Sequence, residues 1–265
     1  DQVQTNSSDD TVNQYLHPKT ATEPKQVKPN TQYDSDIKFG GFKKAEYNSD
    51  IDSFKNIDNT HLSFFYVTEP ERVNISLSKS RHPPKAFKDH YRLEALYPVD
   101  KKRNIKIATV LFPYNDKHSK AHITRKTKDG ARGVQISHGN DIRDHFYIGN
   151  KADKMHKISD RCRFRGEAAF YRSNEQVTES YFVRKGTTFR VEEQGFSSDQ
   201  AISLYMQETT GRITVNEPTK VTFYYPGVSG VQLDNKILEP VSAADGSVQI
   251  EISSVSNQQI KLKFE

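Results

Sequence analysis

The chain has 265 residues and a mass of 30.4 kDa, and its 39 lysines and arginines exceed its 34 aspartates and glutamates by a formal net charge of +5. This length permits one large domain or two small ones, and no stretch approaches the roughly 18 uncharged apolar residues of a membrane-spanning helix. The 15 phenylalanines and 13 tyrosines exclude full disorder, and the single cysteine, Cys162, excludes an internal disulfide and a cysteine-based zinc cluster.

Residues 1–36 are poor in apolar side chains and rich in Asn, Thr, Gln, Pro and Lys, which is typical of a linker or a surface arm. The chain begins with Asp-Gln-Val and carries no secretion-leader pattern, so we expect a processed chain or a piece of a longer protein. The sequence therefore predicts a polar N-terminal arm over residues 1–36 and one β-sandwich domain over residues 37–265.

From residue 61 onward apolar side chains recur with period two, and β-branched and aromatic residues are frequent, which predicts β-strands. Residues 61–67 and 72–78 are expected to form a strand pair, and residues 105–112 a strand buried on both faces. Turn residues such as Lys185-Gly punctuate further strands, expected at 91–97, 134–137, 144–148, 165–171, 179–184, 187–192, 202–207, 212–215, 221–225, 247–252 and 259–264. A dozen or more strands without a helical stretch predict an all-β fold, a large antiparallel β-sandwich.

The positive charge is concentrated in residues 79–132, which hold 15 basic and 5 acidic side chains and so a local charge of +10. Such a concentration favours an anionic partner, and the alternative is a solvated basic surface without a ligand. One loop in it carries groups suited to a carboxylate or sulfate, and we predict substrate binding by Arg81, His82, Lys85, His90 and Arg92. The histidines here follow no known metal spacing, so neither a metal nor another cofactor is predicted.

A second group of polar side chains lies at 138–148, around an expected turn and strand. Because side chains alternate along a strand, Asp144 and His145 should point to opposite faces, whereas His145 and Tyr147 should share one. A histidine beside a tyrosine suits proton transfer next to a carboxylate, so His145 and Tyr147 are the candidate catalytic residues. The alternative is a hydrogen-bonded sheet surface without catalysis.

A third group is the alternating set Arg161, Arg163 and Arg165, which should line one face of a strand and leave Cys162 on the other face as a small buried side chain. A row of guanidinium groups binds carboxylates or phosphates well, and we include Arg161 and Arg163 among the predicted substrate-binding residues. The alternative is neutralisation by a neighbouring acidic strand.

The order of segments in the chain resembles that of a known family. A strand ending in TVLFP at 109–113 is followed by DHFYIGN at 144–150, DRCRF at 160–164, AAFYR at 168–172 and YFVRKGT at 181–187, and strands over 202–207 and 221–225 complete the series. Over about residues 60–265 this order resembles the C-terminal β-sandwich of the heparinase II/III-like polysaccharide lyases, which include alginate lyases built from a toroid and a sandwich.

The resemblance implies cleavage of an acidic glycan by β-elimination at a uronic acid. In such a reaction a cation or amide neutralises the C5 carboxylate, and tyrosine or histidine side chains remove the C5 proton and protonate the leaving oxygen. It further implies an α/α-toroid in the same parent protein, which this chain lacks and which would supply most catalytic groups, and a secreted or periplasmic location. We therefore predict the C-terminal sandwich portion of a polysaccharide lyase, a carbon–oxygen lyase, whose activity depends on that helical domain.

The same basic surface also fits a different class of protein, a non-catalytic carbohydrate-binding or adhesion module for anionic polysaccharide. The two hypotheses differ in whether a bound uronate polymer is depolymerised. A nucleic-acid partner is not favoured, because no recognised platform for single strands accompanies the basic residues.

Overall fold

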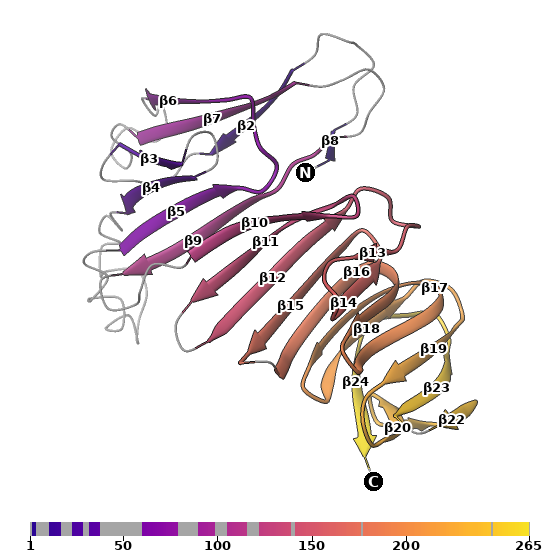
Figure 1. Ribbon diagram of the computed structural model, residues 1–265. Helices are drawn as coiled ribbons and strands as arrows, with labels where there is room; N and C mark the ends of the chain where they lie inside the picture. Colours follow the sequence, from indigo (N-terminus) through magenta and orange to yellow (C-terminus); the bar gives the residue numbers. More distant parts are fainter. Residues whose placement is uncertain are drawn as a thin grey trace, which may run out of the picture. The chain divides into compact units, whose positions relative to one another are not determined.

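The computed structural model describes residues 2–3, 11–16, 23–28, 32–37, 60–78, 90–98, 105–115, 122–138, 141–175, 177–244 and 246–264. These residues form strands and turns and no helix, so the predicted all-β fold is confirmed (Figure 1). It follows that no helix in these ranges is long and apolar enough to cross a membrane. The chain divides into two compact units, Asp1–Ala121 and His122–Glu265, each described here by itself.

Unit 1 contains three antiparallel sheets, ordered β1-β8, β2-β7-β6 and β3-β4-β5-β9. Their strands are β1 (Gln2–Val3), β2 (Thr11–Leu16), β3 (Lys25–Lys28), β4 (Gln32–Ile37), β5 (Thr60–Tyr66), β6 (Arg72–Ser78), β7 (His90–Pro98), β8 (Ile105–Lys106) and β9 (Thr109–Asn115). Segments of the predicted N-terminal arm thus belong to sheets, since β2 pairs with β7 and β4 pairs with β5. The division at residues 121 and 122 also lies within the range predicted as one sandwich domain.

The core of unit 1 joins strands of its two larger sheets. Phe64 and Tyr66 of β5 are buried in one cluster with Leu93 and Tyr97 of β7. A polar link accompanies this packing, because the Gln14 Oε1 atom accepts hydrogen bonds from the hydroxyls of Tyr97, at 3.2 Å, and Thr109, at 3.0 Å.

Two strand predictions in unit 1 are wrong. The segments 61–67 and 72–78 do not pair with each other, because β5 lies between β4 and β9 whereas β6 pairs with β7. The segment 105–112 is interrupted between β8 and β9. There the Ala108 carbonyl accepts hydrogen bonds from the backbone amides of Val67 and Thr68, and the Ala108 amide donates one to the Thr68 hydroxyl. Nor is this segment buried on both faces, since the side chain of Leu111 is 50% exposed.

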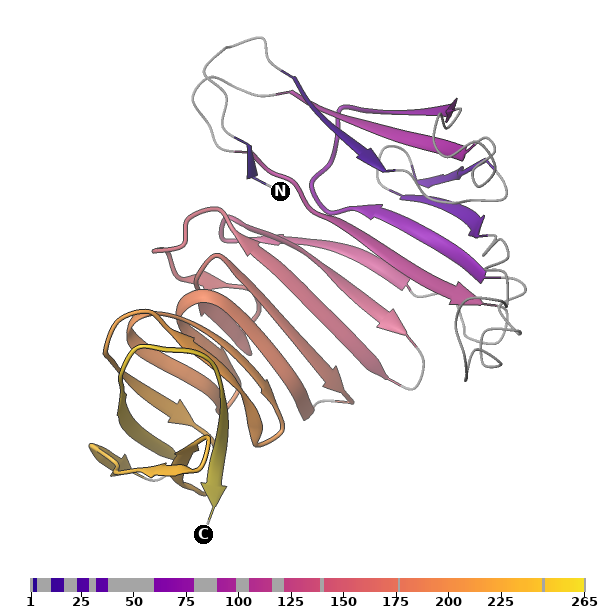
Figure 2. The ribbon, with the colours of Figure 1, turned by 180° about the vertical axis from the view of Figure 1, so that it is seen from behind.

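Unit 2 forms one antiparallel sheet of fifteen strands. They are β10 (His122–Lys128), β11 (Ala131–His138), β12 (Ile142–Gly149), β13 (His156–Lys157), β14 (Cys162–Arg165), β15 (Ala168–Asn174), β16 (Val177–Val191), β17 (Gln194–Gln207), β18 (Thr210–Val215), β19 (Thr219–Tyr224), β20 (Val228–Leu233), β21 (Lys236–Leu238), β22 (Ser242–Ala244), β23 (Ser247–Ile252) and β24 (Val255–Phe264). Strands β10, β11, β12 and β15 lie side by side, and from behind the later strands, orange to yellow, curl around one another (Figure 2).

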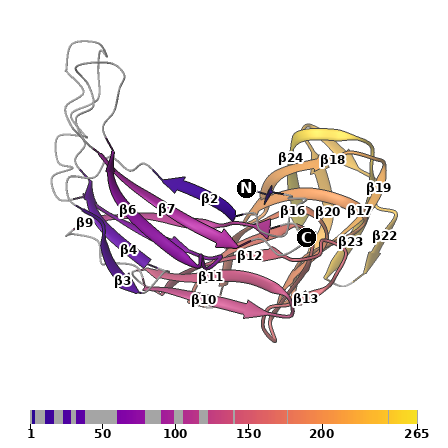
Figure 3. The same cartoon turned by 90° about the horizontal axis from the view of Figure 1, so that it is seen from above.

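Two long strands turn this single sheet into two layers. The first half of β16 pairs with β15 and its second half with β14, while β17 pairs with β19 through residues 195–198 and with β18 through residues 202–207. One layer therefore runs through β15, β16, β17, β18 and β24, and the other through β14, β16, β17, β19 and β23. Seen from above, β16 and β17 both curve into the C-terminal strands (Figure 3).

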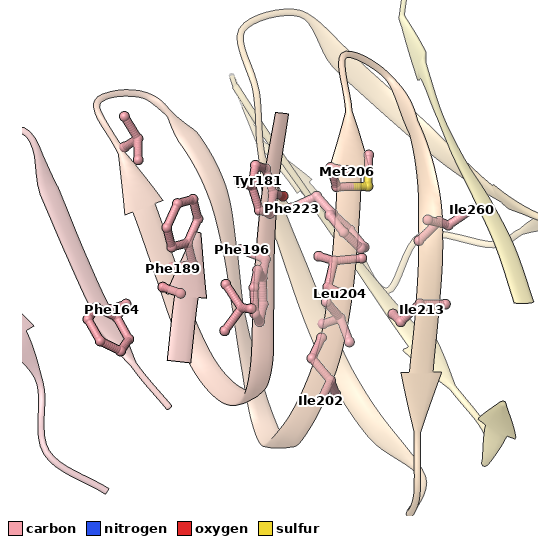
Figure 4. Close-up of a cluster of buried hydrophobic side chains, with 14 of the residues drawn as sticks. Phe164, Tyr181, Phe189, Phe196, Ile202, Leu204, Met206, Ile213, Phe223 and Ile260 are labelled. Carbon is pink, nitrogen blue, oxygen red and sulfur yellow. The ribbon is translucent and has the colours of Figure 1, made fainter. Parts of the chain in front are cut away.

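The core of unit 2 lies between these layers (Figure 4). Leu204, Met206 and Ile213 come from one layer, and Phe189 and Phe223 are among the aromatic side chains of the other. The two layers also share a buried hydrogen bond, which the Tyr225 hydroxyl donates to the Tyr181 hydroxyl at 3.1 Å. This packing supports the predicted β-sandwich for the second unit.

The predicted turn at Lys185-Gly is instead a bend inside β16. Lys185 has a φ of 43°, and the pairing of β16 with β17 shifts register on both sides of Gly186. A side-chain carbon at Gly186 would lie 2.5 Å from Val183 Cγ1 and 2.8 Å from the Arg165 carbonyl oxygen. The bend thus needs a glycine at its tightest point, and it lets the strand pass from one layer to the other.

Candidate functional site

Several of the predicted substrate-binding residues cannot be placed. Arg81, His82 and Lys85 lie outside the described residues. His90 is the first residue of β7 and pairs with Ser78, but its side chain is also outside the description. Arg92 is half-buried in the same strand. Binding by this group therefore stays a prediction.

His145 and Tyr147 share a face of β12, as the alternation predicts, and their ring centroids lie 6.5 Å apart. His145 is closer to Tyr171, its cross-strand neighbour on β15, with ring centroids 4.1 Å apart and ring planes within 5°. The imidazole is thus stacked on a tyrosine that is itself part of the core of unit 2. This stack fixes the ring at the margin of the core.

The surroundings of His145 keep its imidazole neutral. The pKa of His145 is lowered to about 4, chiefly by burial; the Arg143 charge also lowers it, Asp144 raises it, and Lys126 adds a smaller lowering. Its Nδ1 atom is buried and has no hydrogen-bond partner among the described residues. The imidazole is therefore an unprotonated but weak base, and the two neighbouring cations are suited to attract a negatively charged group.

Asp144 lies on the opposite face of β12 and is occupied by a different partner. The Arg172 Nε and Nη2 atoms donate hydrogen bonds to its two carboxylate oxygens, at 2.7 and 2.8 Å. The ion pair is bidentate and joins cross-strand neighbours of β12 and β15. This confirms that Asp144 is not a direct acid–base partner of His145.

Tyr147 is far less accessible than His145. Its side chain is only 4% exposed, and burial raises its pKa well above the ordinary value for a tyrosine. The ring lies over Gly133, where any side chain would collide with it. Tyr147 therefore stays protonated and packs in the core, which favours His145 as the proton-exchanging group of the pair.

The predicted alternation of the arginine segment is confirmed. Cys162 and Phe164 are buried, whereas Arg161, Arg163 and Arg165 are exposed. Burial raises the pKa of the Cys162 thiol to about 12, which makes it an inert packing group. Arg161 is neutralised by an acidic side chain, because its guanidinium lies 3.0 Å from the Glu192 carboxylate. It is thus a weaker candidate for binding an external anion than Arg163.

Arg163 has a cationic neighbour that the sequence analysis did not identify. In the ladder between β14 and β16 it lies opposite Arg190, whose guanidinium is stacked on the Tyr224 ring at 3.9 Å. The three residues are far apart in sequence and meet only because β14, β16, β17 and β19 are neighbours. The period-two pattern places Arg190 on the same face of its strand as other polar residues, but it says nothing about strand order.

No protein-family model and no curated protein matches this chain. Within the described parts of the chain, no group of three or more His, Cys, Asp or Glu side chains could hold a metal ion. The arrangement therefore offers two kinds of chemistry on unit 2: proton acceptance at His145, and binding of an anion by exposed arginines.

Proposed function

We propose that this chain is the C-terminal β-sandwich portion of a secreted or periplasmic polysaccharide lyase that degrades an acidic, uronate-containing glycan by β-elimination. The observation that carries the proposal is the half-buried, neutral imidazole of His145, stacked on Tyr171 and close enough to Arg143 and Lys126 to feel both charges. A general base must be unprotonated at the working pH, and neighbouring cations favour a carboxylated substrate.

The roles in this reaction follow from the chemistry of the residues. His145 removes the C5 proton of the uronate, and the charges of Arg143 and Lys126 stabilise the negative charge that develops on the carboxylate. Tyr147 supports the site through packing, since it is buried behind the imidazole face. A helical domain of the parent protein completes the cleft and supplies the remaining groups, as the family resemblance implies.

The test is formation of unsaturated uronate, followed by its absorbance, on alginate, heparin and chondroitin. It is carried out with the chain alone and with the full product of its gene. We expect H145Q to lower the rate by about 10²- to 10⁴-fold, the usual effect of losing a general base. The matched control is R184Q, since Arg184 is exposed and paired with Glu167. If the full gene product cleaved none of these polymers, the proposal would be overturned.

A second candidate function is a non-catalytic module that binds anionic polysaccharide, and the exposed arginines of β14 favour it. This function predicts retention of the chain on immobilised heparin or alginate without any depolymerisation. Retention that survives H145Q but is lost when Arg163 is replaced by glutamate would support the module. Cleavage that depends on His145 would support the lyase.

A further inference from the structure

Arg163 and Arg190 form an unusual pair, because like charges that lie directly opposite each other in a β-ladder repel. Neither guanidinium has an ion pair with a carboxylate in the part of the chain that the structure describes, whereas Arg161, Arg172 and Arg184 each have one. The repulsion is therefore not offset within unit 2 by a described carboxylate contact.

Arg190 is nevertheless held in a fixed position. Its guanidinium lies over the ring of Tyr224, a residue of β19, at 3.9 Å from the ring centroid. The residue between them in the ladder is Gly195, with a φ of 140°, where a side chain would collide with the Phe189 carbonyl. The Tyr224 hydroxyl in turn lies 3.0 Å from the Ser197 hydroxyl. Glycine thus lets the β16 and β17 backbones approach closely at this point, and the tyrosine orients the guanidinium.

The surroundings of Arg190 leave part of its hydrogen-bonding capacity unused. Its Nε atom is buried and has no hydrogen-bond partner among the described residues. Burial lowers the pKa of Arg190, Tyr224 raises it, Arg163 lowers it, and Glu193 raises it least. The next row of the ladder begins at Arg165. Its other members are neutral and polar, namely Thr188, Ser197, Thr222 and Gln249.

We propose that Arg163 and Arg190 form an oxyanion-binding site, preorganised by Tyr224 and Gly195, for a carboxylate or sulfate group of an acidic glycan. The bound anion contacts both guanidinium groups and offsets their like charge. It accepts charge-assisted hydrogen bonds from both arginines, and the neutral polar row beside them offers hydroxyl and amide groups to the sugar. The inference rests on the proposed function only in naming a glycan as the carrier of the anion.

The site is tested by NMR on the ¹⁵N-labelled chain, through the Nε–Hε resonances of its arginines. Titration with sodium glucuronate should shift the Arg163 and Arg190 resonances along one saturable curve. Titration with inorganic sulfate distinguishes a sulfate site from a carboxylate site, and titration with glucose, which has no charge, should have no effect. Unchanged resonances of both arginines with both anions would overturn the proposal.

Variants separate this pair from the general positive charge. R163Q and R190Q should each weaken anion binding at least about tenfold, since a hydrogen bond to a charged group is worth about 1.5–3 kcal/mol. R184Q removes the same charge from an arginine that is paired with Glu167, and it should leave the affinity unchanged. Y224F keeps the ring under Arg190 and should bind, whereas Y224V should not. If R184Q lost as much anion affinity as R163Q and R190Q, binding would reflect the general positive charge, and the proposed site would be overturned.

The two proposals fail in different ways. Cleavage of a uronate polymer without a response of Arg163 and Arg190 to either anion would refute this site and leave the proposed function standing. A saturable response of both arginines without cleavage of any polymer by the full gene product would support the site and refute the lyase.

Discussion

The neutral state of His145 makes the stability of unit 2 depend on pH. Its pKa is about 4 in the folded chain against an ordinary value of 6.5, so between these values the unfolded chain binds a proton that the folded chain does not. The contribution of this group to stability is full above pH 6.5 and is lost as the pH falls toward 4. We expect H145Q to lose less unfolding free energy than the wild type between about pH 7 and about pH 5, as measured by urea denaturation.

The control for this measurement is H122Q, because His122 is exposed on β10. Its pH dependence should follow that of the wild type. If H145Q and the wild type lost equal stability over the same range, the imidazole would not be held neutral by its burial.

Single residues were predictable where only alternation along one strand mattered. The shared face of His145 and Tyr147 and the burial of Cys162 both follow from the period of two. The stack of His145 on Tyr171 and the contact of Arg190 with Tyr224 were not predictable, because each depends on which strands are neighbours. No local pattern in the sequence carries that information.

At the scale of elements, the bend of β16 shows that Lys185-Gly does mark a change in the backbone, but that its interpretation as a turn between two strands was wrong. Lys185-Gly was expected to be a turn because glycine favours turns, and the backbone there does adopt a positive φ. A bulge within a strand can contain the same positive φ, here at Lys185, so the local sequence cannot distinguish it from a hairpin turn. Only the continued pairing of β16 with β17 on both sides of Gly186 makes this one strand.

We expect Gly186→Ala to destabilise the chain because the new methyl group would crowd Val183 and the Arg165 carbonyl. Overpacking of this kind costs about 1–3 kcal/mol and should lower the midpoint of thermal unfolding by several degrees, measured by circular dichroism. Gly230→Ala is the matched control, since its nearest contact would be Lys263 Cβ at an ordinary 3.7 Å. Equal stability of the two variants would show that the bend does not require glycine.

At the scale of the whole molecule, the all-β architecture was predictable from periodicity, whereas the division of the chain was not. The apolar alternation is the same on both sides of residue 121, so it indicates strands without showing which of them share a core. The structure has one buried cluster around Phe64 and Leu93 and a second around Phe189 and Leu204. Polar composition alone indicated an arm over residues 1–36, and it missed the strands that pair there.

Because these two clusters share no residue, we expect the two units to unfold as separate cooperative blocks. Leu93→Ala and Leu204→Ala each remove a fully buried side chain, and each should destabilise its own unit by about 2–5 kcal/mol. Hydrogen exchange followed by mass spectrometry measures the exchange rates of peptides from both units in one experiment. Leu93→Ala should accelerate exchange in peptides of β5 and β7 and leave β17 and β18 unchanged, and Leu204→Ala should do the reverse. Acceleration across the whole chain in either variant would mean that the units fold as one block, and the site on unit 2 would then depend on both cores.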